Sequence, residues 1–296
     1  MQGGLGNQLS QWYFAHSIAI DSCFRFDPLY NLAKVEHRNF ELAPLMSVCP
    51  HSQNGAQTNF IPFFERVYFR TLNKLWEFKI LRKLVERLGY FREDPRSDQM
   101  QSKNVTRSLK YARGYFQKHS EIEKVFECVR TEMFPIIDAV LADVRSKLNL
   151  TSEYTVIHVR RGDYASIDFT PVYIGTLSDQ YFIEGSKSLK NSNLLLLTEN
   201  QEDVKSLVQN LGPCTVLDKT RTSPWETLAI LAGATQFLGS NSSLSWWGAR
   251  LCFARGGQVW LPEQWSYWKN IDPNDYHFPG SNVLKPYWIE DELPGR

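Results

Sequence analysis

Residues 154–164 read YTVIHVRRGDY and join an apolar strand pattern to a cluster of charges. The β-branched run from Thr155 to Val159 is typical of a buried strand. Arg160 and Arg161 follow at once, and two guanidiniums at the end of a buried strand are costly to desolvate unless they meet an anion. Ligands bind at this strand end in open α/β sheets, so the pair predicts a diphosphate site. The alternative is an ion pair with Asp163 at a turn.

Beyond this stretch the pattern alternates between strands and helices. Apolar runs predict further strands at residues 193–198, 214–217, 236–239 and 258–261. Helices are predicted at 224–232 and from about 243, the first of them with Pro224 and Glu226 in its first turn. Such alternation predicts a parallel sheet covered by helices, a Rossmann-like domain.

Residues 240–249 read SNSSLSWWGA at a predicted strand–helix junction. The partial positive charge of a helix N-terminus favours a phosphate or nucleoside there. Four polar residues of the junction form the expected donor site: Asn241, Ser242, Ser243 and Ser245. Helix capping by Ser242 or Ser243, with Trp246 and Trp247 in the core, is the alternative, and it is compatible with ligand binding.

The N-terminal residues contain a glycine-rich loop, GGLGNQ at 3–8. Gly4 and Gly6 allow close approach of a ligand to the backbone, and Asn7 is expected to cap the helix that follows. The spacing is not GxGxxG, which disfavours a nicotinamide cofactor. Because such loops normally follow a strand, we expect the first strand of this domain to be missing from the sequence.

Two helical regions follow. Residues 60–88 are basic and read as one or two helices, for which a solvated face is the favoured interpretation and contact with anionic lipid headgroups the alternative. Residues 121–148 read as a helix interrupted at Pro135. The predicted domains are therefore an N-terminal domain over 1–149 and the Rossmann-like domain over 150–296.

The composition describes a globular protein, with 43% hydrophobic and 22% charged residues. A net charge of +1 gives no reason to expect a nucleic-acid partner. The five cysteines are dispersed without CxxC spacing, which fits a reducing compartment and no zinc site. With neither a signal peptide nor a membrane-spanning apolar run in the sequence, we expect a cytoplasmic protein, or one peripheral to the cytoplasmic membrane face.

The motifs GGLGNQ, HVRRGDY and SNSSLSWWGA, in this order, resemble the α-1,2-fucosyltransferase family, glycosyltransferase family 11. GYFQ at 114–117 is similar to a segment that precedes the arginine motif in that family. HxRRxD is shared with α-1,6- and peptide-O-fucosyltransferases and indicates the donor class, whereas SNSSLSWWGA points to family 11. The sequence departs from the family in lacking the first strand and at Ser10, where an aromatic residue is usual.

The resemblance implies an α/β enzyme of the GT-B type, with two Rossmann-like domains facing across a cleft. It implies metal-independent, inverting transfer of L-fucose from GDP-fucose to the 2-hydroxyl of a galactose-terminated glycan, without a cofactor. A GT-B transferase with another donor or linkage, or a non-catalytic GDP- or glycan-binding derivative, are the alternatives.

Roles for individual residues follow from this chemistry. Arg160 and Arg161 are expected to hold the diphosphate, with Arg160 the first choice for catalysis. His158 shares a strand face with Arg160 and is expected to contact the donor, with a hydrogen-bonded core histidine as the alternative. Asp163 is expected to orient an arginine, because a carboxylate beside two guanidiniums has a depressed pKa and is a poor base.

The acceptor side is expected in the N-terminal loop. Peptide-O-fucosyltransferases have a similar GNQ loop near their acceptor, so Asn7 and Gln8 are expected to face the reacting centre, with helix capping as the alternative. The general base is left open, with Asp168 and Glu199 as candidates.

Overall fold

The structure is a computed structural model that describes residues 4–18, 41–48, 63–92, 111–162, 174–190, 193–267, 272 and 275–292. The chain divides into two compact units, Met1–Glu132 and Met133–Arg296. The division falls within helix α7 (Phe126–Leu148), whereas the sequence prediction places it after residue 149, just past the end of that helix.

The C-terminal unit is built on a six-stranded parallel sheet in the order β5-β4-β3-β6-β7-β8. The strands are β3 (Thr155–Val159), β4 (Leu194–Thr198), β5 (Thr215–Leu217), β6 (Gln236–Leu238), β7 (Gln258–Pro262) and β8 (Asn282–Leu284). Counted along the chain this is the order 3-2-1-4-5-6 of dinucleotide-binding Rossmann folds. The predicted α/β class is confirmed, and so are five strands. Strand β8 was not predicted, because it lies at the edge of the sheet and its residues are largely exposed, so they carry no buried apolar run.

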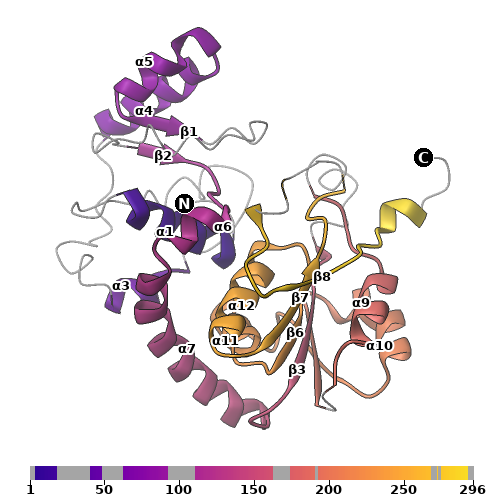
Figure 1. Cartoon of the computed structure of the whole chain (residues 1–296). Coiled ribbons are helices and arrows are strands. Elements are labelled where there is room, and N and C mark those ends of the chain that lie inside the picture. The colour runs from indigo at the N-terminus through magenta and orange to yellow at the C-terminus, as the bar shows by residue number, and fades with distance from the viewer. Residues whose placement is uncertain are drawn as a thin grey trace. The chain divides into compact units, whose positions relative to one another are not determined.

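Helices cover both faces of this sheet (Figure 1). One face carries α11 (Pro224–Ala232), α12 (Ser243–Ala254) and the later turns of α7, and the other carries α9 (Asp179–Ser186), η4 (Gln201–Val204) and α10 (Lys205–Leu211). The chain continues to η6 (Ile289–Glu292). Helix α11 begins with a capping box, in which Ser223 and Glu226 each accept a hydrogen bond from the other's backbone N–H.

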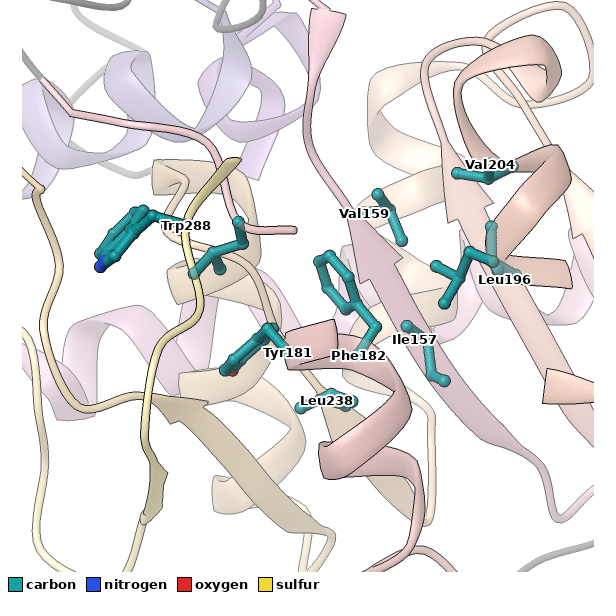
Figure 2. Close-up of a cluster of buried hydrophobic side chains, with 10 residues drawn as sticks. Ile157, Val159, Tyr181, Phe182, Leu196, Val204, Leu238 and Trp288 are labelled. Carbon is teal, nitrogen blue, oxygen red and sulfur yellow. The ribbon is translucent and has the colours of Figure 1, made fainter. Parts of the chain in front are cut away.

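The core on the α9 side explains how β3 presents its side chains. Ile157 and Val159 pack there with Phe182, Leu196 and Val204, as Figure 2 shows. Since neighbouring residues of a strand point to opposite faces, Val156 and His158 belong to the α11–α12 face. The two arginines that follow β3 inherit this alternation.

The N-terminal unit is largely helical in its described part. Its helices are α1 (Leu5–Ile18), α3 (Ala43–Val48), α4 (Phe63–Trp76), η1 (Lys79–Leu81), α5 (Arg82–Arg87) and α6 (His119–Glu123), and a parallel pair joins β1 (Tyr90–Arg92) to β2 (Tyr111–Arg113). The basic region is helical, as predicted, and forms α4 and α5 joined by the short η1. Within the described residues, no helix is both long and apolar enough to cross a bilayer.

Two local predictions are corrected. Helix α1 begins at Leu5, so Asn7 lies inside its first turn and is not the N-cap residue. The N-cap is Gly4, whose carbonyl oxygen accepts the first helical hydrogen bond from Gln8 N at 3.1 Å. Helix α7 continues through Pro135. The interruption of the helical region lies earlier in the chain, between the end of α6 at Glu123 and the start of α7 at Phe126.

Helix α7 tolerates Pro135 because buried apolar residues anchor the helix both before and after the proline. Met133, Ile137 and Leu141 recur at four-residue spacing and are buried. The apolar stripe that they form outweighs the one backbone hydrogen bond that a proline removes.

Candidate active site

The arginine and serine motifs lie at the topological switch point of the sheet. From β3 the chain builds β4 and β5 on one side and then crosses to β6 on the other side of β3. Ile157 of β3 pairs with Leu238 of β6, so Arg160 and Asn241 each lie three residues beyond paired positions. Ligands of open α/β sheets bind in the crevice that this reversal opens at the carboxyl ends of the strands.

Arg160 meets an acidic residue from the neighbouring strand. Its Nη1 forms an ion pair with Oε1 of Glu199, which directly follows β4. The carboxylate packs over the backbone of Gly162, where an added Cβ would lie 1.6 Å from Glu199 Oε2 and φ is +24°. The left-handed φ favours glycine at this turn, where the Glu199 side chain would have to shift to admit a Cβ. The guanidinium of Arg160 is already held against an oxyanion.

Arg161 turns to the opposite face of the sheet. Its guanidinium donates to the carbonyl oxygen of Asp203 at 2.6 Å and pairs with Asp179 Oδ1 of α9 at 2.5 Å. It also lies 5.9 Å from the ring centre of Phe182. Strand alternation sends Arg161 to the α9 side, where it ties β3 to α9, and leaves Arg160 at the switch point. The two guanidiniums expected to hold the diphosphate therefore lie on different faces of the sheet.

His158 lies on the same face as Arg160 and is only 5% exposed. Burial, with a smaller contribution from the positive charge of Arg160, lowers its pKa to about 3, so the imidazole is neutral at physiological pH. In the described part of the chain, no group forms a hydrogen bond with its Nδ1. A core histidine with a purely structural role would be expected to have both ring nitrogens hydrogen-bonded, and Nδ1 of His158 does not fit that expectation.

The serine motif combines capping with unsatisfied polar groups. Ser242 caps α12 by accepting from Ser245 N at 3.1 Å, and Ser245 Oγ accepts from Ser240 N at 2.9 Å. The capping interpretation is thus correct for Ser242. Ser240 Oγ and Asn241 Oδ1 are buried, and neither has a hydrogen-bond partner among the described residues. Two such groups beside a helix N-terminus are suited to receive a polar ligand.

The amide nitrogen of Asn241 has a structural task. It donates to the carbonyl oxygens of Gly175 at 3.0 Å and Trp265 at 3.3 Å, so it holds the segment that leads into α9. Ser243 is half-buried in the first turn of α12. Trp246 and Trp247 are buried, as the alternative interpretation requires.

In the N-terminal unit, two motifs far apart in the sequence come together. Gln117 Nε2 donates a hydrogen bond to Asn7 Oδ1. Phe116 stacks on Phe14 of α1, with 3.9 Å between ring centres, and adopts a φ of +53°. A left-handed φ at a non-glycine residue costs free energy and is found mainly at functional loops. The pair Asn7–Gln117 is therefore the candidate polar site of this unit.

The other predicted residues of this loop serve the fold. Gln8 is fully buried, and its Oε1 accepts from Glu41 N at 2.9 Å. The carbonyl oxygen of Gly6 accepts from Ser10 Oγ at 3.2 Å, which gives that buried hydroxyl its partner. Gly4 ends the loop at the start of α1. Asp163 and Asp168 lie outside the described residues.

Sequence reasoning missed two contacts that organise the site. Asp179 forms an ion pair with Arg161. The sequence feature that could have indicated this contact is an acidic residue at the start of the helix that follows the arginine motif. Glu290 accepts from Thr176 N at 3.1 Å through its carboxylate, which fixes the entry to α9 from the C-terminal segment. Nothing in the local sequence pairs Glu290 with Thr176.

A comparison with protein-family models gives a match. The model of glycosyl transferase family 11 matches residues 61–266, a range that includes the arginine and serine motifs. A crystal structure of POFUT1 in complex with GDP (crystal form III) aligns at 15% identity over 86% of this chain and 94% of that chain, with a TM-score of 0.39, too low to carry any argument about the site. No curated protein matches the sequence.

Proposed function

The chain belongs to glycosyl transferase family 11, and from this we propose that it transfers L-fucose from GDP-fucose to the 2-hydroxyl of a galactoside, with inversion. One observation carries the proposal: Arg160 lies at the switch point of a Rossmann-type sheet, beside the neutral His158.

The diphosphate of the donor is placed at Arg160. A guanidinium binds phosphate oxygens through charge-assisted hydrogen bonds, and the Glu199 carboxylate shows that an oxyanion can reach Nη1. The N-terminus of α12 favours the same negative charge. Asn241 Oδ1, Ser240 Oγ and the half-buried Ser243 would then bind polar groups of the nucleoside or its phosphates.

The reaction is a single in-line displacement. The acceptor oxygen forms a bond to the anomeric carbon as the bond from that carbon to the β-phosphate oxygen breaks, and GDP leaves with the electron pair. Arg160 stabilises the negative charge that grows on the leaving phosphate. His158, being neutral, can exchange a hydrogen bond with the donor but adds no charge.

The proton of the attacking hydroxyl passes to a base that we leave unassigned. Glu199 is committed to Arg160 and suits orientation better than proton transfer. For Asp163 we keep the role of orienting the arginine. On the acceptor side, Asn7 and its partner Gln117 would offer amide groups to galactose hydroxyls. The buried Gln8 would help to hold the loop in place through its hydrogen bond with Glu41 N.

We also propose that no divalent ion or cofactor is required, because the fixed charge of Arg160 can do what a metal ion does for a leaving diphosphate. Addition of a chelator should therefore leave the transfer rate unchanged. A rate that is lost on chelation and restored by a divalent salt would contradict this part of the proposal.

The deciding experiment is a transfer assay with GDP-fucose and a panel of β-galactosides, with the new linkage identified by NMR. Arg160→Ala should lower turnover by on the order of a hundredfold, the loss of about 3 kcal/mol seen when a single oxyanion donor is removed. Arg130→Ala, which removes an exposed arginine paired with Glu127, serves as the control and should leave turnover unchanged.

The alternatives give different results in the same assay. Turnover of GDP-mannose in place of GDP-fucose, or a product that is not linked to the 2-hydroxyl, would indicate another donor or linkage. GDP binding by calorimetry with no transfer to any galactoside would indicate a non-catalytic binding protein. Full activity of Arg160→Ala would refute the assignment of the diphosphate site.

A further inference from the structure

The two basic helices of the N-terminal unit expose an unusual amount of apolar surface. Among the described residues nine large hydrophobic side chains are exposed, and seven of them fall between residues 64 and 88. These seven define what we call the α4–α5 surface: Phe64, Val67, Tyr68, Phe78, Ile80, Leu84 and Leu88. Ile80 is 94% exposed and Phe78 63%, whereas a helix face adapted to water would carry polar groups at such positions.

This surface is distinct from the small core of the two helices. Leu72 and Trp76 of α4 are buried against Val85 and Tyr90. Val67 lies on another side of the same helix, because the five residues that separate it from Leu72 correspond to a rotation of about 140°. Tyr68 lies one turn before Leu72 and continues the row of Leu72 and Trp76 to the solvent-exposed part of the helix. Helix α4 therefore exposes apolar side chains beyond those that its own core buries.

The apolar side chains of the two helices adjoin one another. The hydroxyl of Tyr68 on α4 donates to the carbonyl oxygen of Leu88, just after α5, at 3.4 Å. Leu84 and Leu88 are separated by one helical turn and so share a face of α5. Exposed residues of α4 and of the end of α5 thus adjoin one another at Tyr68 and Leu88.

Positive charge accompanies the apolar groups. Residues 63–92 contain eight lysines and arginines and three glutamates, a formal charge of +5 in a chain whose net charge is +1. Arg70 and Lys74 are exposed on α4, and Lys79, Lys83 and Arg87 are exposed on η1 and α5. Long basic side chains can lay their stems along apolar surface while their charged ends reach outward.

We propose that the α4–α5 surface docks this protein on an anionic lipid membrane. Short amphipathic helices with exposed apolar residues and basic flanks lie in the headgroup region, where the apolar side chains enter the acyl boundary and the cations meet lipid phosphates. Charge complementarity selects this occupant: a basic apolar surface suits an anionic bilayer and repels another copy of itself. This proposal takes up contact with anionic headgroups, the alternative to the solvated face that the sequence favours.

The experiment is flotation of the full chain with vesicles of phosphatidylcholine alone or mixed with phosphatidylglycerol. The protein should float with the anionic vesicles, and its binding should weaken at high salt. The double variant Lys79→Glu/Lys83→Glu should bind at least about tenfold more weakly, since each lysine near the surface contributes roughly 1 kcal/mol. Lys190→Glu/Lys219→Glu is the matched control on exposed lysines of the C-terminal unit and should bind like the wild type.

A second variant tests the apolar part. Phe78→Ser/Ile80→Ser replaces two exposed side chains, so it should fold, as circular dichroism can verify, and yet lose binding to anionic vesicles. Transfer to a soluble acceptor should be unchanged in every variant, which separates this proposal from the proposed function. Absence of wild-type binding to anionic vesicles would overturn the proposal. So would a wild-type dimer that the Phe78→Ser/Ile80→Ser variant converts to a monomer, because the surface would then join two copies.

Discussion

Substitution of His158 by glutamine tests the electrostatics at the centre of the site. In the folded protein burial lowers the pKa of His158 to about 3, whereas an unfolded histidine titrates near 6.5. The folded state therefore excludes a proton that the unfolded state accepts. Stability from this group is fully present above the unfolded pKa and is lost as pH falls from about 6.5 toward 3.

The size of the effect follows from the two pKa values. Between about pH 7.5 and 5.5 the unfolded histidine becomes almost fully protonated while the folded one stays neutral, which removes about 1.4 kcal/mol from the free energy of unfolding. Glutamine has a similar size and can form hydrogen bonds but takes up no proton. The His158→Gln variant should therefore lose about 1.4 kcal/mol less than the wild type over this interval.

The assay is urea denaturation of the full chain at both pH values, followed by tryptophan fluorescence. His277→Gln is the matched control, since His277 Nε2 lies 2.9 Å from the carbonyl oxygen of Pro262, away from β3. Equal pH dependence in His158→Gln and wild type would refute the reasoning, as would an NMR titration of His158 with a midpoint near 6.5.

Two further changes test how the neighbouring residues are held. Arg161→Met should lower the free energy of unfolding by about 3 kcal/mol, because it removes the ion pair with Asp179 and the hydrogen bond to the Asp203 carbonyl. The measurement is urea denaturation, and an unchanged midpoint would contradict a role of Arg161 in the fold. Gly162→Ala should destabilise the protein by roughly 1–3 kcal/mol, because its Cβ would meet Glu199 at a left-handed φ. Adding Glu199→Ala to Gly162→Ala should remove the steric part of this loss in a double-mutant cycle, and strict additivity would exclude that contact.

Much of the C-terminal unit could be predicted from local patterns. The apolar runs located five of the six parallel strands, and Pro224 with Glu226 located α11. These features are readable because strand alternation and helix capping depend on residues within a few positions of one another. Helix α7 resisted the same approach, since its continuation through Pro135 depends on packing along its whole buried side.

The family resemblance came from three motifs that each remain continuous in the sequence, and the match to glycosyl transferase family 11 confirms it. Their contacts could not be obtained in this way. Asn7 and Gln117 are 110 residues apart, and their hydrogen bond exists only because the segment around Phe116 folds onto α1. A resemblance identifies such residues but not the partner that each one meets.

The sequence by itself determined where the buried strand ends and that two guanidiniums follow it. Which partner each guanidinium has depends on tertiary contacts: Arg161 forms an ion pair with Asp179 of α9, and Arg160 forms one with Glu199 beside the switch point. The physical reason is the pleat of the strand, which sends successive side chains to opposite faces, combined with the sheet order, which decides what stands on each face. A strand's alternation can be read from a dozen residues, but the neighbours on its two faces come from segments that the chain brings back much later.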